Sequence, residues 1–167
     1  LREMVNNGED LSRVITSKVF NMGELFKGKP INGNISRWDV SNVDFMHSMF
    51  MDTSFNQDII NLFVSNLNNM CQMFIGAISF NQDIGGWNTS NVVNMASMFF
   101  EATSFNQNIG KWNLSEVFDM NQMFRGATSF NQDLSSWDVS SVTNMYGVFY
   151  DASSFNQDLS SLSLIHI

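Results

Sequence analysis

The chain has 167 residues, 44% of them hydrophobic, and a formal net charge of −8 at pH 7. The length suits one ordinary domain or one short repeat array, and the apolar content excludes a disordered acidic chain. The acidic balance argues against nucleic acid as a partner, because phosphate binding needs a basic surface.

Two further features of the composition narrow the class of protein. The single cysteine, Cys71, excludes an internal disulfide, and there is no zinc-ligand spacing. No apolar run is long enough to span a bilayer, so we expect no membrane span. No signal peptide is visible, and because the chain begins with Leu1 instead of methionine we expect a fragment of a longer protein.

Residues 1–13 fall outside the repeat that follows. Leu1, Met4 and Val5 can form the apolar side of a short helix that ends near Asn7-Gly8. A repeat array must cover the open apolar end of its first unit, and terminal units are usually atypical. We therefore predict that residues 1–13 form an N-terminal cap.

From residue 14 the chain repeats itself every 24 or 25 residues. The motif Phe-Asn-Gln occurs five times, starting at Phe55, Phe80, Phe105, Phe130 and Phe155. A methionine column holds Met22, Met46, Met70, Met95, Met120 and Met145, and a phenylalanine column holds Phe26, Phe50, Phe74, Phe99, Phe124 and Phe149. Columns that never vary are expected inside the array, and columns that vary outside it.

Within one unit the apolar spacing predicts a helix and short strands. Met95, Met98, Phe99 and Ala102 have the spacing of one helix face. Asn or Asp before the first methionine has N-cap chemistry, and a glycine after the phenylalanine can end the helix. Period-two alternation at 112–114 predicts a strand, and residues 106–109 are a second candidate.

These elements predict an α/β repeat fold. It is a right-handed solenoid of about six coils of 24–25 residues, each with short parallel strands and a short helix, over residues 14–162. Leu162 stands at the tryptophan position of the last unit, and residues 163–167, where the array stops, are predicted to be a truncated or non-native tail.

The polar columns supply the candidate interaction residues. Five asparagines in register are predicted to form an inward ladder that satisfies backbone groups, with an exposed binding strip as the alternative. The glutamines are predicted to point outward. The candidate interaction surface consists of Gln57, Gln82, Gln107, Gln132, Gln157, Asp58, Asp83, Asn108, Asp133 and Asp158. Stacked carboxylates repel one another, and either solvent or a bound cation such as calcium would relieve this repulsion.

The unit at residues 137–161 is similar to a known bacterial repeat. Its sequence is W-D-V-S-S-V-T-N-M-Y-G-V-F-Y-D-A-S-S-F-N-Q-D-L-S-S. It resembles the 25- to 26-residue surface-protein repeat of mycoplasma-type lipoproteins, which is grouped with BspA-like leucine-rich repeats, over about residues 14–162. The resemblance implies a leucine-rich-repeat-like solenoid, a cell-surface or secreted location, adhesion or protein binding, and neither a catalytic residue nor a cofactor.

The primary functional hypothesis is a non-enzymatic interaction module with an unidentified protein or cell-surface ligand. The alternative is a cation-stabilised structural stalk that uses the stacked Asp column. An enzyme is the weakest hypothesis, because catalytic residues normally break a repeat and the breaks here are only Asn108, Phe45 and the two ends. His47 and His166 have no recurring partner, so no catalytic, metal or cofactor residue is assigned.

Overall fold

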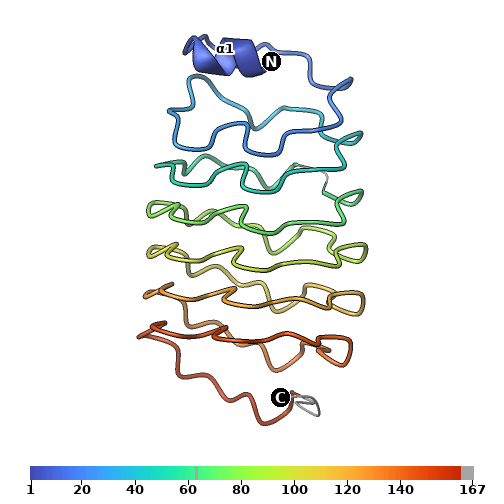
Figure 1. The fold of residues 1–167 in the computed structure, drawn as a ribbon, viewed down its shortest axis with the longest axis vertical. Coiled ribbons are helices and arrows are strands. Elements are labelled where there is room, and N and C mark those ends of the chain that lie inside the picture. The colour runs from blue at the N-terminus through green and yellow to red at the C-terminus, as the bar shows by residue number, and fades with distance from the viewer. Residues whose placement is uncertain (63, 163–167) are drawn as a thin grey trace.

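The repeat builds a stack of coils that lie one above another along a single axis (Figure 1). The computed structural model describes residues 1–62 and 64–162. Neighbouring coils are joined by single parallel bridges, Asn21↔Phe45, Phe45↔Asn69, Asn69↔Asn94, Asn94↔Asp119 and Asp119↔Asn144. Each coil therefore sits in register with the next.

The predicted α/β solenoid, with a helix and strands in every coil, is wrong. Over the described residues the one helix is α1, Arg2–Asn6, and the pairing between coils consists of isolated bridges without a sheet. The fold class is therefore a stack of turns and extended segments, and the leucine-rich-repeat-like architecture does not apply.

The segment predicted as helical is a chain of turns because two of its residues are left-handed. Ser97 and Glu101 have φ values of 54° and 55°, where a right-handed helix needs negative values. The same two positions are left-handed in the other coils, at Glu24, Ser48, Gln72, Gln122 and Gly147, and at Gly28, Asp52, Gly76, Gly126 and Asp151.

Hydrogen bonds that a helix would make internally are made between coils instead. The backbone N–H of Ser97 donates to the carbonyl oxygen of Asn121 at 2.8 Å, and that of Phe99 to Met123 at 2.9 Å. The intervening N–H of Met98 closes a four-residue turn onto the carbonyl oxygen of Met95 at 3.2 Å. Every second peptide group thus ties one coil to the next, which accounts for the close and regular stacking.

The segments predicted as strands form no ladder with a neighbouring coil. Trp112 N–H closes a turn onto the carbonyl of Ile109 at 3.1 Å, and no ladder forms over 106–109 or 112–114. The alternation in the sequence reports burial alone, since Trp112 and Leu114 are buried and Asn113 is exposed.

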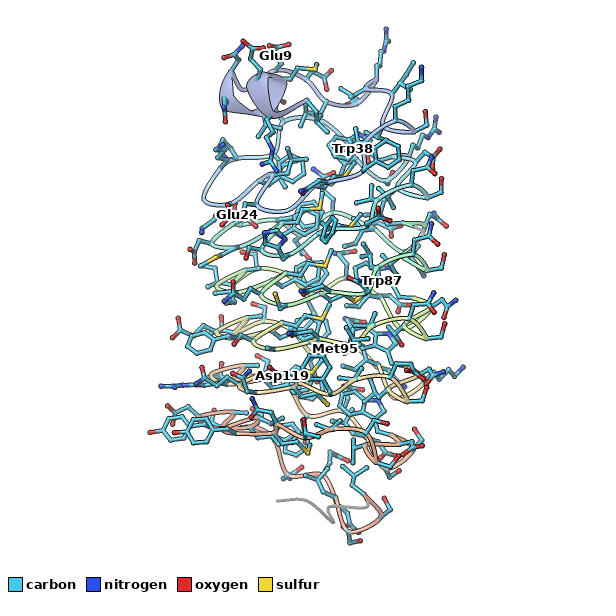
Figure 2. The ribbon with its side chains drawn as sticks, turned by 45° about the vertical axis from the view of Figure 1, so that its right-hand side comes forward. Glu9, Glu24, Trp38, Trp87, Met95 and Asp119 are labelled. Carbon is cyan, nitrogen blue, oxygen red and sulfur yellow. The ribbon has the colours of Figure 1, made fainter. Side chains whose placement is uncertain are left out.

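The core consists of continuous columns of aromatic and methionine side chains. The Phe99 ring stacks on Phe105 of its own coil at 3.9 Å between centroids, and on Phe74 and Phe124 of the adjacent coils at 5.6 Å. Met95 is fully buried near the middle of the stack, and Trp87 lies to the right of it in Figure 2.

The tryptophan column belongs to the core. Trp112 is 4% exposed, and its indole N–H donates to the carbonyl of Ile84 in the preceding coil at 3.1 Å. Trp38, Trp87 and Trp137 make the equivalent bond. The polar tip of each tryptophan is therefore satisfied inside the core.

Helix α1 lies over the first coil at the N-terminal end of the stack (Figure 1). It ends at Asn6, and Gly8 follows with φ 67°, as the sequence predicts. The Arg2 guanidinium donates to the carbonyl oxygen of Gly23 at 2.7 Å, so the helix satisfies a backbone acceptor of the first coil. The predicted tail, residues 163–167, lies outside the described residues.

Candidate interaction surfaces

The asparagine column forms a ladder on the surface and not in the interior. The Asn106 Oδ1 accepts the backbone N–H of Asn131 at 2.9 Å and the side-chain Nε2 of Gln132 at 2.8 Å. Asn56, Asn81 and Asn131 accept the equivalent bonds from the coil that follows. The prediction that these amides satisfy backbone groups is right, but they do so between coils and remain half-buried or exposed.

The glutamine column is more covered than the sequence predicts. Gln82, Gln107, Gln132 and Gln157 are half-buried, and each donates its Nε2 to the asparagine of the preceding coil. Gln57 donates to the carbonyl of Gly33 at 3.0 Å instead. These side chains are therefore bound to the framework, and a partner could reach only what the ladder leaves open.

The Asp58, Asp83, Asn108, Asp133 and Asp158 column is exposed and closes turns. Each side-chain oxygen accepts the backbone N–H two residues later, at 2.8–3.0 Å. The backbone N–H of Ser135 lowers the pKa of Asp133, and Ser160 does the same for Asp158. Across the described part of the chain, no three His, Cys, Asp or Glu side chains gather as a metal ion would require. The cation alternative therefore gains no geometric support.

A second surface, which the sequence reasoning did not assign, lies along the left-handed turns. We call it the turn face and define it as the positions directly after the first methionine and directly after the phenylalanine of each coil. Its members are Gly23, His47, Cys71, Ala96, Asn121 and Tyr146, and Lys27, Met51, Ile75, Phe100, Arg125 and Tyr150. Gly23 is the one buried position among them. No residue type recurs in either column, in contrast to the framework columns beside them.

The turn face carries an aromatic cluster around Arg125 at its C-terminal end. The Arg125 guanidinium carbon lies 4.8 Å from the centroid of the Tyr150 ring and 5.4 Å from that of Phe100. Arg125 and Tyr150 also line a hollow of about 250 Å³ together with Tyr146 and Gly147. Tyr146 is 75% exposed and Tyr150 58%. Aromatic residues and arginine are the types enriched where proteins meet.

Comparison with known proteins places the chain in a family. The family described as "Mycoplasma protein of unknown function, DUF285" matches residues 1–97 and again residues 79–166. The chain belongs to this family. Two overlapping matches fit a tandem repeat, and they confirm the mycoplasma-type part of the resemblance but not the BspA or leucine-rich-repeat part. Neither the curated proteins nor the solved structures gave a match.

Over residues 1–62 and 64–162, no helix is long and apolar enough to cross a bilayer.

Replacing Asn106 by alanine is expected to destabilise the stack by about 1–2 kcal/mol, because it removes the acceptor of two inter-coil hydrogen bonds. Water can reach this surface, which keeps the cost below that of a buried deletion. Urea unfolding measures the change. The matched control is Asn61→Ala, an exposed asparagine, and equal losses for the two variants would contradict the bracing role of Asn106.

Acidification is expected to destabilise the protein as the pH falls below the ordinary aspartate pKa of 3.8. The turn-closing hydrogen bonds lower the native pKa of Asp133 and Asp158, and Ser41 and Ser140 do so for Asp39 and Asp138. Their contribution is complete above the unfolded pKa and is lost as the pH falls through the lowered native pKa.

Thermal melts between pH 6 and pH 2 measure this dependence. The control replaces those four aspartates by asparagine, which already closes the same turn at Asn108. On acidification, the melting temperature of the variant should fall less than that of the wild type. An identical loss in the two proteins would show that these carboxylates do not set the acid response.

Proposed function

We propose that the protein is a non-enzymatic interaction module, exposed on a cell surface or secreted, that contacts a protein or cell-surface ligand through its turn face. The location and the adhesive or protein-binding role rest on the resemblance to surface-protein repeats. The choice of face rests on the exposed aromatic cluster at Tyr146, Tyr150 and Arg125.

The difference between the framework columns and the turn-face columns supports this choice. The framework columns are nearly constant, and their side chains either fill the core or bond to the adjacent coil. Both columns of the turn face hold a different residue in every coil, and the coils still pair in register. A surface that can vary without loss of the fold is suited to specific recognition, and exposed tyrosines supply contact area at a low entropic cost.

Binding of the labelled protein to a panel of purified extracellular proteins and to intact cells tests the proposal. The variant Tyr146→Ser/Tyr150→Ser removes the cluster from the turn face. The matched variant Asp83→Ser/Asp133→Ser alters the candidate interaction surface predicted from sequence, and serine still can close a turn there. We expect the first variant to lose binding and the second to keep it.

The reverse result would move the interaction to the Gln and Asp columns, as the sequence first suggested. If both variants keep full binding, both assignments of the interaction surface are contradicted. The cation-stabilised stalk is tested separately by melting the protein with and without a calcium chelator, where a fall in melting temperature on chelation would support it.

A further inference from the structure

Resting on the proposed function, we infer that the hollow beside Arg125 binds the C-terminal carboxylate of a partner polypeptide whose last residue is apolar. The site combines an arginine without a carboxylate partner among the described residues, a mainly acidic surrounding, a hollow lined by tyrosines and a glycine at its wall.

The guanidinium packs over aromatic rings and pairs with no carboxylate of the described residues. Its carbon lies over the Phe100 ring and over the Tyr150 ring, which come from the two adjacent coils. Within the described residues, the one ion pair is Lys27–Glu24, and no oxygen accepts a hydrogen bond from the Arg125 side chain. Rings that cover the faces leave the N–H donors at the edge free, and that edge is the part of arginine that matches a carboxylate with two hydrogen bonds.

The surrounding charge favours a ligand with one carboxylate over a polyacid. From residue 38 to the end, Arg125 and Lys111 are the only basic residues among twelve acidic ones, and Glu101 and Asp151 flank the cluster in sequence. A run of acidic residues would be repelled by this field. The C-terminus of a chain carries its carboxylate on the same carbon as a side chain, so it brings a single charge together with an apolar group.

The walls of the hollow suit such an apolar group. Tyr146 and Tyr150, both from the coil that follows Arg125, line the hollow beside the arginine, and its volume of about 250 Å³ admits one residue and not a long segment. A carboxylate at the guanidinium edge would place the adjoining side chain against these rings.

At the wall of the hollow, one coil lacks a side chain that the other coils have. Gly147 occupies the left-handed position that holds Glu24, Ser48, Gln72, Ser97 and Gln122 in the other coils. Its φ of 60° is close to the 53° of Gln122, so the backbone accepts glutamine there. A Cβ added at Gly147 would meet Gln122 Cγ at 3.7 Å and Tyr150 Cβ at 3.8 Å, which are ordinary contacts. Gly147→Gln therefore fills the hollow with a residue that the repeat already uses.

Titration of the isotope-labelled protein with acetyl-Gly-Leu, followed by NMR at the Arg125 side-chain N–H and the Gly147 backbone N–H, tests the inference. The comparison ligand is the same dipeptide with a C-terminal amide. We expect the acid to bind with a dissociation constant on the order of 1 mM. The amide should bind at least about tenfold more weakly, because it loses a charge-assisted pair.

Three variants define the site. Arg125→Gln and Gly147→Gln should each weaken binding of the acid by about tenfold or more, and Lys111→Gln should leave it unchanged. Gly147→Gln keeps the arginine and its charge, so its effect separates filling of the hollow from loss of the cation, and thermal melts confirm that each variant is folded.

Equal binding of the acid and the amide would overturn the inference, as would full binding by Gly147→Gln. If glucuronate shifts the same two N–H groups and acetyl-Gly-Leu does not, the ligand is an acidic sugar and the polypeptide assignment fails. If Tyr146→Ser/Tyr150→Ser abolishes partner binding and Arg125→Gln does not, the proposed function stands and the carboxylate site is wrong.

Discussion

Replacing Phe99 by alanine is expected to lower the free energy of unfolding by about 3–5 kcal/mol. Phe99 is fully buried and stacks on Phe74, Phe105 and Phe124, so its removal leaves a cavity bordered by rings of three coils. Those rings are fixed by their own neighbours along the stack and cannot collapse into the space. Urea unfolding monitored by tryptophan fluorescence measures the loss.

Phe118→Ala is the matched control, because it deletes the same side chain from the neighbouring coil where the ring is 47% exposed. It should cost less than about 1 kcal/mol, as surface substitutions usually do. Since a linear array is held together by contacts between neighbours, Phe99→Ala should also split the unfolding into two transitions. Similar losses for the two variants would contradict a continuous aromatic core.

The sequence predicted burial well and backbone conformation poorly, and the methionine segment explains why. Met95, Met98, Phe99 and Ala102 are all fully buried, as the spacing predicts. The same spacing is produced by turns with left-handed residues at Ser97 and Glu101, because both paths return side chains to one face. The helix prediction failed because apolar periodicity reports which side faces the core and not which hydrogen bonds form.

One signal for the correct conformation was present in the sequence. Gly28, Gly76 and Gly126 share a column, and all three are left-handed. A glycine column at this place also fits the end of a helix, which favours left-handed glycine as well. Only the hydrogen bonds to the next coil distinguish the two cases, and these depend on how coils stack.

On the surface, comparison between repeats selects the recurring columns and passes over the turn face. Comparison between repeats directs attention to what recurs, so the Gln and Asp columns are the predicted candidates. The structure shows that the glutamines bond to the preceding coil and that the Asp column closes turns within its own coil. Tyr146, Tyr150 and Arg125 recur nowhere in their columns and were missed, although variation between coils was the sign of an outward position. A period of 25 residues cannot tell a side chain that braces the next coil from one that is free to bind.

Replacing Ser97 by proline is expected to destabilise the protein by at least about 3 kcal/mol. Proline fixes φ near −65°, whereas Ser97 has φ 54°, and it removes the N–H that donates to the carbonyl of Asn121 at 2.8 Å. Both effects act on the segment that ties one coil to the next, so the change should separate the stack at this level. Urea unfolding measures the loss, and hydrogen exchange locates it.

Ser97→Gly is the control that distinguishes the turn from a helix. At a left-handed position, glycine relieves about 1–2 kcal/mol of steric strain and costs about 0.5–1 kcal/mol in chain entropy, so stability should stay level or rise by up to about 1.5 kcal/mol. In a helix interior the same change would cost about 0.5 kcal/mol, because glycine has a lower helix propensity than serine. A clear loss on Ser97→Gly would therefore restore the helix at 95–102 and remove the basis for bonding between coils through this segment.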